Sequence, residues 1–292
     1  MSQQINSYFQ HFRPGYSINC GGKLLDLHRP IVMGILNVTP DSFYDGGKFT
    51  EESSILEKVR ELVAGGAQII DIGAASSRPG AQFIDENTER QRLIPTIRLI
   101  SMHFPDLLIS VDTWRSTIGR EAIANGAHII NDISGGELDP EMFKTVGELG
   151  IPYILMHMQG TPDQMQVAPD YENVLTEVIQ SIQSKVSQLR QNGVKDIIID
   201  PGFGFGKSLE HNYTLLNHLD QFHLLECPIL VGFSRKSMIN KVLKTNAETA
   251  LNGTTILNTI GLMKGAHILR VHDAREAYEC TLILQQLEAT LK

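Results

Sequence analysis

Two acidic residues and one amide stand at the ends of three apolar segments of the sequence. Asp112 ends Leu-Leu-Ile-Ser-Val-Asp, Asn131 follows His-Ile-Ile, and Asp200 follows Ile-Ile-Ile. A buried carboxylate needs hydrogen-bond donors or a cation as its partner. Carboxylates beside an amide therefore predict a binding site for a heterocycle that carries several N–H donors.

Positively charged side chains gather near the C-terminal end of the chain. Arg235 and Lys236 lie in Ser-Arg-Lys-Ser at the start of a predicted helix, where positive charge opposes the helix dipole. This placement indicates either a ligand that compensates the charge or two solvated cations. Arg270 and His272 lie two residues apart in a predicted strand, so their side chains share a face. These residues are candidates for binding an anion, although the chain as a whole is acidic.

Polar loops contribute further candidates. The loop from Asn37 to Gly47 is longer than a structural connection needs, which favours a lid over a plain surface loop. Ser77 and Arg78 lie in a turn that ends at Gly80. A guanidinium suits phosphate or carboxylate, while a lone arginine is also common at a solvated surface.

A third loop reads Asp-Pro-Gly-Phe-Gly-Phe-Gly-Lys over residues 200–207. Its alternate glycines let the backbone approach a ligand closely, but their spacing is not that of a phosphate-binding P-loop. We expect that Phe203 and Phe205 are not both buried in this turn, so that one ring faces a flat substrate. Elsewhere, Asp71 lies deeper in its segment and is interpreted as structural, and His157 is interpreted as a packed histidine.

Eight apolar segments position these residues. Runs of four to six apolar residues suit strands that are buried on both faces, and here they cover 31–37, 69–71, 107–112, 128–132, 153–157, 197–200, 229–234 and 267–272. Helical patterns separate them at 52–64, 86–103, 115–125, 140–149, 171–192, 209–220, 236–243, 248–264 and 274–291. Eight alternations predict an α/β fold, the (β/α)8 TIM barrel, with its active site at the C-terminal ends of the strands. A doubly wound sheet is disfavoured, because no Gly-x-Gly-x-x-Gly turn follows the first strand.

The segment before the first barrel strand has its own pattern. Residues 16–27 place Gly21-Gly22 between two apolar-rich stretches, which predicts a β-hairpin that closes the bottom of the barrel. We find no Pro/Gly/Ser-rich linker or change of composition in the chain. The sequence therefore predicts one domain over 1–292, with the barrel at about 30–290.

Composition excludes several classes of protein. The net charge of −8 and the pI of about 5.7 argue against a nucleic-acid partner. Three widely spaced cysteines, Cys20, Cys227 and Cys280, without a Cys-x-x-Cys motif, fit reduced thiols in a cytoplasmic protein. The N-terminus lacks the basic start and apolar stretch of a signal peptide, and no run is long enough to span a membrane.

The motifs, in this order, resemble those of the dihydropteroate synthase family. The resemblance runs from about residue 17 to 285, and eight motifs in register at predicted strand ends make it specific. It rests on Ile35-Leu-Asn-Val-Thr-Pro-Asp-Ser-Phe43, Asp71-Ile-Gly73 with Ser77-Arg-Pro-Gly80, Ser110-Val-Asp112, Ile130-Asn-Asp132, Leu155-Met-His-Met-Gln-Gly160, Asp200-Pro-Gly-Phe-Gly-Phe-Gly206, Ser234-Arg-Lys-Ser237 and Arg270-Val-His-Asp273.

The resemblance implies both an activity and an assembly. Members of the family are (β/α)8 barrels and commonly homodimers. They join 4-aminobenzoate to 6-hydroxymethyl-7,8-dihydropterin diphosphate with Mg2+, which yields 7,8-dihydropteroate and pyrophosphate. Their partners are thus small molecules, and departure of the diphosphate would run ahead of attack by the weakly nucleophilic amine.

The resemblance also implies roles for individual residues. The pterin would be held by Asp112, Asn131, Asp200 and Lys236. Asn37 would contact the Mg2+-diphosphate, which Arg270 and His272 would bind. The aminobenzoate pocket would be lined by Ser77, Pro79, Phe205 and Ser237, with Arg78 on its loop and Arg235 at its floor or on the aminobenzoate carboxylate. Catalysis would rest on Lys236, Asp112 and Asp45. The carboxylates of Asp112 and Asp45 would stabilise positive charge on the pterin.

Two departures from the family pattern stand out. Ala74-Ala75-Ser76-Ser77 replaces the usual Gly-Glu-Ser-Thr, and Tyr44 replaces a small residue. Both lie on the loops that bear on sulfonamide response and loop closure. Neither removes a residue assigned to the chemistry.

Three alternative functions share parts of this pattern. A pterin-binding methyltransferase module would use a methylated folate and usually a corrinoid partner. A class I aldolase would form a Schiff base on Lys236. A non-catalytic paralogue would bind pterin only. The Ser-Arg-Lys-Ser motif and the Arg270 and His272 pair favour diphosphate chemistry, and every matched catalytic position is filled.

Overall fold

The strands of the computed structural model, which describes residues 14–39, 48–74, 84–160 and 169–290, form a central barrel. Eight parallel strands stand in the order β8-β7-β6-β5-β4-β3-β10-β9, and a parallel bridge between Ile199 and Ile229 joins the two ends of the sheet. Their bounds are β3 (Ile31–Asn37), β4 (Ala67–Gly73), β5 (Leu108–Asp112), β6 (Ile129–Asp132), β7 (Tyr153–Met156), β8 (Ile197–Asp200), β9 (Leu230–Val231) and β10 (Ile268–Val271). The predicted (β/α)8 barrel is confirmed.

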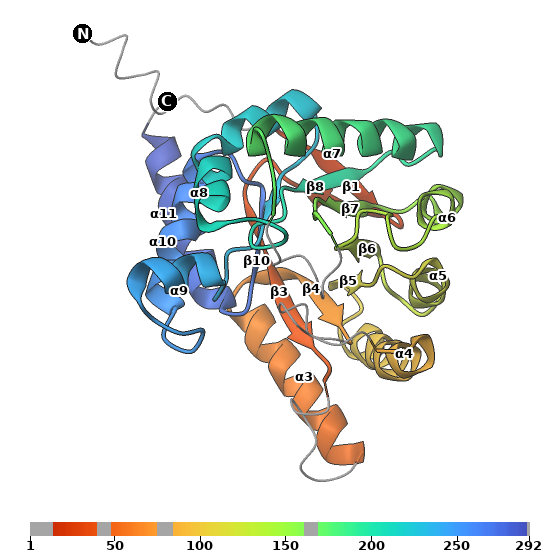
Figure 1. The fold of residues 1–292 in the computed structure, drawn as a ribbon. Helices are drawn as coiled ribbons and strands as arrows, with labels where there is room; N and C mark the ends of the chain where they lie inside the picture. Colours follow the sequence, from red (N-terminus) through yellow and green to blue (C-terminus); the bar gives the residue numbers. More distant parts are fainter. Residues whose placement is uncertain (1–13, 40–47, 75–83, 161–168, 291–292) are drawn as a thin grey trace, which may run out of the picture.

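Helices surround the barrel on its outside (Figure 1). They are α3 (Lys48–Ala64), α4 (Glu86–His103), α5 (Ser116–Ala124), α6 (Met142–Leu149), α7 (Val174–Gln191), α8 (Leu209–Asn217), α9 (Ser237–Leu243), α10 (Leu251–Met263) and α11 (Ala274–Ala289). The helix predicted over 209–220 is instead divided between α8 and a 3-10 helix, η1 (Leu219–Leu225). None of the described helices is long and apolar enough to cross a membrane.

Helix ends follow local chemistry. The side chain of Asp85 accepts a hydrogen bond from the Thr88 backbone N–H at 3.0 Å and so caps α4. Ser208 and His211 form a reciprocal capping box at the start of α8. Gly150 ends α6 in the left-handed conformation, which glycine adopts without a steric penalty.

The inner face of the barrel changes from apolar to polar along the strands. Side chains two residues apart point to the same face of a strand. An apolar layer lies at the N-terminal end, made of Met33, Ile69, Leu108, Ile129, Ile154, Ile198, Leu230 and Ile268. Two residues further along each segment the sequence has Ile35, Asp71, Ser110, Asn131, Met156, Asp200, Gly232 and Arg270. The C-terminal end of the barrel is therefore the end equipped for chemistry.

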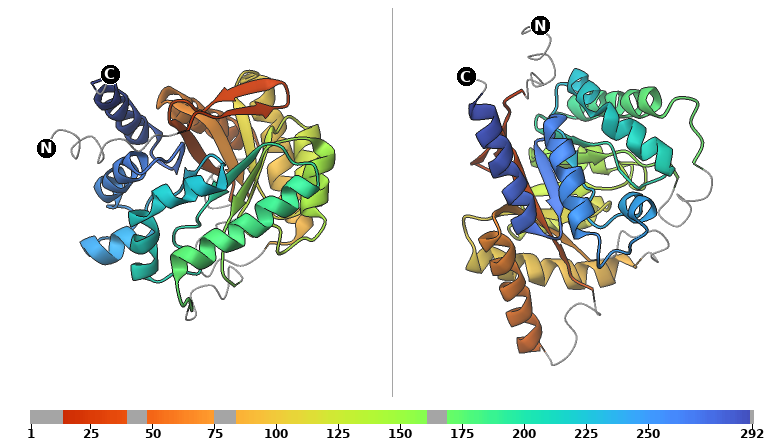
Figure 2. Two further views of the ribbon diagram at one scale, coloured as in Figure 1. Left: turned by 90° about the horizontal axis from the view of Figure 1, so that it is seen from above. Right: turned by 90° about the vertical axis from the view of Figure 1, so that its left-hand side faces the viewer.

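The predicted hairpin is present and closes the opposite end of the barrel. Strands β1 (Ser17–Cys20) and β2 (Lys23–Asp26) pair antiparallel, and Gly21 and Gly22 form their turn with positive φ angles. Inward-facing Ile18, Cys20, Leu25 and Leu27 belong to the same hydrophobic cluster as the apolar layer of the barrel. Figure 2 shows the hairpin across the strand ends.

Candidate active site

A buried set of charged side chains crosses the C-terminal end of the barrel. Arg270 donates from Nε to Oδ2 of Asp71 at 2.6 Å and from Nη2 to Oδ2 of Asp112 at 2.7 Å. Oδ2 of Asp71 also accepts a hydrogen bond from Nδ2 of Asn131 at 3.0 Å. One guanidinium thus links β10 to β4 and β5. We call the mouth cluster the six residues Asp71, Asp112, Asn131, Asp200, Lys236 and Arg270.

Burial and mutual charge shift the proton equilibria in the mouth cluster. Burial raises the pKa of Asp112 to about 7; the guanidinium of Arg270 opposes this shift, and the carboxylate of Asp71 adds to it. Burial lowers the pKa of Lys236 to about 8 against the opposing effect of Asp200. Burial likewise raises the pKa of Asp200, against the opposing effect of Lys236. Groups that exchange protons near neutral pH are frequent at functional sites.

Asp71 lies within the cluster and binds two of its other members. Its side chain is fully buried, and its Oδ2 holds both Arg270 and Asn131. Among the described residues, its Oδ1 and Oγ of the neighbouring Ser110 have no hydrogen-bond partner. Through this hydrogen bond to Nε, Asp71 orients the guanidinium of Arg270.

Lys236 lies above the glycine-rich loop that follows β8. Its Nζ donates to the carbonyl oxygen of Phe203 at 2.6 Å and lies 4.7 Å from the ring centroid of Phe205, within the range of a cation–π contact. It directly precedes α9, so the helix start places the ammonium at the barrel mouth.

The expectation that one of the two phenylalanines is exposed is wrong. Both rings are buried: Phe203 packs on Phe233 with 4.6 Å between centroids, and Phe205 packs in a cluster with Met156 and Met158. The glycines at 202, 204 and 206 all have positive φ angles. The backbone therefore turns sharply between the two rings, and each ring finds its own apolar contacts.

His157 is buried, as expected for a packed histidine, and it has a partner that the sequence reasoning missed. Nζ of Lys207 lies 3.1 Å from its Nδ1. Burial, together with the charge of Lys207, lowers the pKa of His157 to about 2. The ring is therefore neutral at physiological pH. The sequence feature that could have predicted this contact is Lys207 itself, which directly ends the glycine-rich loop.

Arg235 already has a compensating charge within the protein. It forms a two-point ion pair with Asp273, from Nη2 to Oδ1 at 2.6 Å and from Nε to Oδ2 at 3.0 Å. The charge argument for a ligand at the start of α9 thus applies to Lys236 and not to Arg235. Ser237 is exposed as the first residue of α9. The backbone N–H of His272 donates to Oγ of Ser234 at 3.2 Å and ties the ends of β9 and β10 together.

Of the remaining expected site residues, only Asn37 lies within the described ranges. Asn37 ends β3 on its inner face, with its side chain half-buried. Asp45, Ser77, Arg78 and Pro79 lie outside the described residues, as do Tyr44 and Ala75. Within the described ranges, no group of three or more His, Cys, Asp or Glu side chains is arranged to hold a metal ion.

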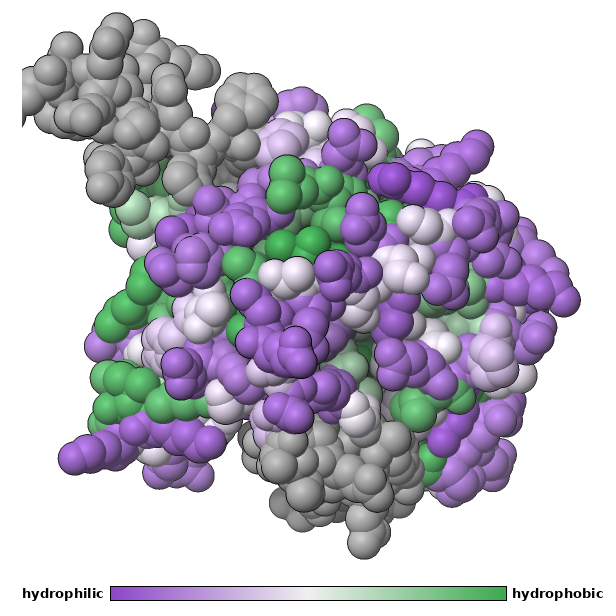
Figure 3. Space-filling model, turned by 45° about the horizontal axis from the view of Figure 1, so that its top comes forward, coloured by the Kyte–Doolittle hydropathy of each residue, from purple (hydrophilic) through white to green (hydrophobic). Residues whose placement is uncertain are grey.

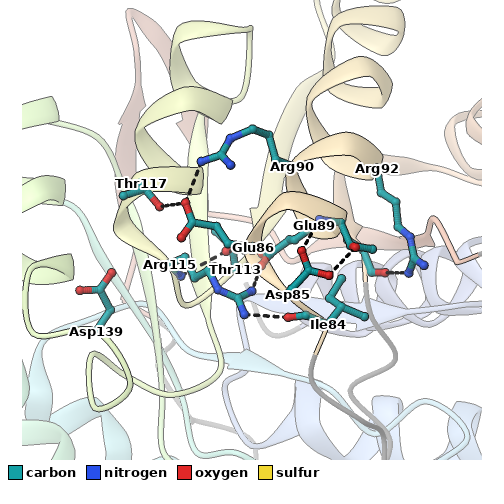
Figure 4. Close-up of polar contacts among 12 residues, drawn as sticks. Ile84, Asp85, Glu86, Glu89, Arg90, Arg92, Thr113, Arg115, Thr117 and Asp139 are labelled. Carbon is teal, nitrogen blue, oxygen red and sulfur yellow. Dashed lines mark hydrogen bonds and ion pairs between the residues drawn. The ribbon is translucent and has the colours of Figure 1, made fainter.

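A second polar network stands behind Asp112, and sequence reasoning missed it. Oγ1 of Thr113 donates to Glu89 of α4 at 2.5 Å, and Arg115 pairs with the other oxygen of Glu89 (Figure 4). Arg115 also donates to the carbonyl oxygen of Ile84 at 2.7 Å. These contacts tie the end of β5, which bears Asp112, to the start of α4. Nothing in the local sequence marks Glu89, since it lies within a helix among other polar residues.

Known proteins share both the sequence and the fold. A family model described as pterin binding enzyme matches residues 33–272. The dihydropteroate synthase of Escherichia coli strain K12 is 44% identical over 272 residues, which cover 92% of this chain and 95% of that protein. The dihydropteroate synthase of Streptococcus pyogenes is 41% identical over 270 residues, covering 91% and 98%.

Solved structures agree with these relatives. The dihydropteroate synthase of Yersinia pestis, in complex with a sulfonamide drug, has a TM-score of 0.88 and 39% identity over 94% of this chain and 100% of that chain. The Xanthomonas albilineans enzyme with 4-aminobenzoic acid has a TM-score of 0.88 and 36% identity over 94% and 99%. The chain therefore belongs to the dihydropteroate synthases, transferases of the pterin-binding enzyme family.

Proposed function

We propose that this protein condenses 6-hydroxymethyl-7,8-dihydropterin diphosphate with 4-aminobenzoate to form 7,8-dihydropteroate and pyrophosphate. The observation that carries the proposal is the mouth cluster, which combines three carboxylates, two of them buried, with an amide and two cations at one end of the barrel. A pterin edge carries both N–H donors and acceptors, so this set complements it.

The pterin would bind through four residues of the cluster. Asp200 and Asp112 accept hydrogen bonds from ring N–H groups, while Asn131 and Lys236 supply donors to ring acceptors. Asp200 is nine-tenths or more buried, so its carboxylate takes few hydrogen bonds from bulk water. A bound ring would supply hydrogen bonds to it instead. A ligand without matching N–H groups would leave this buried carboxylate without a donor, which is costly. The site therefore selects for pterins.

The diphosphate would lie at the rim formed by Asn37, Arg270 and His272. A guanidinium has five N–H donors, more than the two that Arg270 uses on Asp71 and Asp112. Arg270 can thus bind a phosphate oxygen without leaving its carboxylates. Positive charge at this rim favours departure of the anionic leaving group.

The site also fits a role for Mg2+. Mg2+ is commonly held by one or two protein oxygens, waters and substrate phosphates rather than by a complete protein cage. Asn37, on the inner face at the end of β3, would supply its amide oxygen. When bound, the ion supplies positive charge to the diphosphate oxygens.

The reaction proposed is a dissociative substitution at the exocyclic methylene of the pterin. The C–O bond to the diphosphate breaks with its electron pair on oxygen, and the amine nitrogen of 4-aminobenzoate then bonds to that carbon and loses a proton. The carboxylates of Asp112 and Asp45 stabilise the positive charge of the pterin. The amine needs positioning rather than a strong base.

The aminobenzoate would lie beyond Lys236, which borders both substrate sites. Phe205, whose ring lies beneath the ammonium, and Ser237 at the start of α9 would line this pocket. Ser77, Pro79 and Arg78 would complete it. Arg235, one-third exposed while paired with Asp273, would lie at the pocket floor or meet the aminobenzoate carboxylate through its remaining donors.

We also propose a homodimer in the cytoplasm. Among the described residues, twelve large hydrophobic side chains are exposed, and half of them lie on α10 and α11: Ile256, Met263, Tyr278, Leu282, Ile283 and Leu287. Figure 3 shows hydrophobic surface along the left-hand edge, where α9, α10 and α11 lie in Figure 1. Apolar side chains gathered on one face suit a protein interface. The three free, buried thiols fit a reducing compartment.

Pyrophosphate release from the pterin diphosphate tests the proposed activity. The release is expected to require 4-aminobenzoate and Mg2+ and to produce dihydropteroate in equal amount. Pterin binding without release would instead favour the methyltransferase-like or non-catalytic alternative. A carbonyl adduct on Lys236 after borohydride reduction would favour the aldolase.

A further inference from the structure

We propose that Lys207 is a positioning residue whose buried ammonium holds the glycine-rich loop against the end of β7 and so places Phe205 and Lys236. The kinetic part of this inference rests on the proposed function. The structural part rests on contacts among the described residues alone.

The ammonium of Lys207 is surrounded by acceptors. Its Nζ lies 2.9 Å from the carbonyl oxygens of Gly202 and Phe205, 3.3 Å from the carbonyl oxygen of His157 and 3.1 Å from Nδ1 of that ring. Only 4% of Lys207 is exposed. An ammonium has three N–H donors, and these four acceptors provide a partner for each of them. Because His157 is neutral, its Nδ1 can accept.

Two glycines bring the loop into direct contact with the segment after β7. A Cβ atom on Gly202 would lie 1.8 Å from the carbonyl oxygen of His157, and one on Gly206 would lie 2.5 Å from that of Gln159. Side chains cannot separate the two backbones there. Lys207 thus donates a side-chain hydrogen bond across a contact that the glycines make possible.

The loop held in this way carries the contacts of Lys236. The carbonyl oxygen of Phe203 accepts from Nζ of Lys236, and the ring of Phe205 lies beneath the same ammonium. The loop has other supports: Asn212 accepts from the Gly204 N–H at 2.7 Å, and Tyr171 donates to the Gly206 carbonyl at 3.0 Å. The Phe205 N–H also donates to the Gly202 carbonyl at 3.1 Å. Within the described residues, Lys207 alone bonds the carbonyls of both Gly202 and Phe205.

The chain contains its own reporter of this loop. Trp114 is the only tryptophan in the sequence, and it packs on the hydrophobic cluster that contains Phe205. Its fluorescence therefore responds to displacement of Phe205 without any substrate. A lysine with a purely stabilising role would change the melting temperature but not this emission in the folded state.

The test compares Lys207→Met, which keeps the side-chain length but has no donor, with Lys207→Gln, which keeps two N–H donors. Lys264→Met is the matched control. The ammonium of Lys264 likewise donates to a backbone carbonyl, that of Asn217 at 2.8 Å, but it lies on the outer surface. For folded Lys207→Met we expect altered Trp114 emission and a roughly 100-fold lower kcat/KM for 4-aminobenzoate, since small misplacements have losses of that order. Lys207→Gln should recover part of both.

Emission and kinetics that match the Lys264→Met control would overturn the proposal, and so would failure of both Lys207 variants to fold, which would make Lys207 a stability residue only. If wild-type protein lacks synthase activity, the proposed function fails, yet the emission of Lys207→Met still tests whether the ammonium positions the loop.

Discussion

Replacing Asp71 by asparagine removes one of the two carboxylates that hold the guanidinium of Arg270. The exchange keeps the size of the side chain and an oxygen acceptor, so the loss is one of charge. A hydrogen bond to a charged group contributes about 2 kcal/mol. At roughly 2.1 cal/mol/K per residue, unfolding of 292 residues changes entropy by about 0.6 kcal/mol/K. The melting temperature should therefore fall by roughly 3 °C.

The larger consequence concerns the proton on Asp112. The negative charge of Asp71 helps to keep the pKa of Asp112 at about 7. In Asp71→Asn that charge is gone, and Arg270 is left to Asp112 alone. Both effects favour the carboxylate, so the pKa of Asp112 should fall by on the order of one unit, equivalent to about 1.4 kcal/mol.

The sign of the pH dependence follows from this shift. The pKa of Asp112 is higher in the folded protein than in the unfolded chain, so the folded state binds more protons between about pH 4 and pH 7. This group therefore makes the protein less stable as the pH rises through that range. Its carboxylate, which would bind pterin N–H donors, forms mainly above pH 7. In Asp71→Asn both changes should occur at lower pH.

The assay is kcat/KM for the pterin diphosphate as a function of pH, which reports the pKa values of the free enzyme. The acid limb should lie near pH 7 in the wild type and about one unit lower in Asp71→Asn. Asp26→Asn, a change at an exposed carboxylate, should leave both limb and melting temperature in place. An acid limb that stays at pH 7 in Asp71→Asn would refute the coupling between Asp71 and Asp112.

Four further changes test separate parts of the structure. Lys236→Ala should lower kcat/KM by roughly 100- to 1000-fold, as expected when a preorganised cation is lost; near-normal turnover would contradict its position between the substrates. Asp200→Asn should weaken pterin binding by about 2 kcal/mol, which calorimetry measures, and unchanged affinity would remove Asp200 from the pocket. Glu89→Gln leaves Arg115 without its buried carboxylate, so stability should fall by about 3 kcal/mol in denaturant unfolding; a loss no greater than at an exposed pair would argue against the network. Ile283→Arg, at a side chain that is 70% exposed on α11, should yield folded monomers in sedimentation, and a persistent dimer would place the interface elsewhere.

The error about the two phenylalanines has an instructive physical cause. The expectation was that a glycine-rich turn cannot bury both Phe203 and Phe205. Positive φ angles at alternate residues instead make the backbone zigzag, so that Phe203 packs on Phe233 and Phe205 on the methionines at the end of β7 and after it. Only the packed structure contains those partners.

Local sequence patterns determined most of the architecture. Apolar runs of strand length, helical spacing and glycine punctuation predicted the eight strands, the helices between them and the hairpin at 16–27, because these signals act over a few residues. They also placed Asp112, Asn131, Asp200 and Arg270 at strand ends, where a barrel brings side chains together.

Tertiary structure alone decided which of these side chains pair. Arg270 and Asp71 are 199 residues apart in the chain, and Lys207 and His157 are 50 apart. No local pattern encodes such pairs, since they depend on closure of the barrel and on how far each strand extends into it. The same closure buries the charges, and that burial shifts the pKa values of Asp112 and Lys236 toward neutrality. Residue type and spacing thus indicated the chemistry, while the dielectric environment and the partners came from the fold.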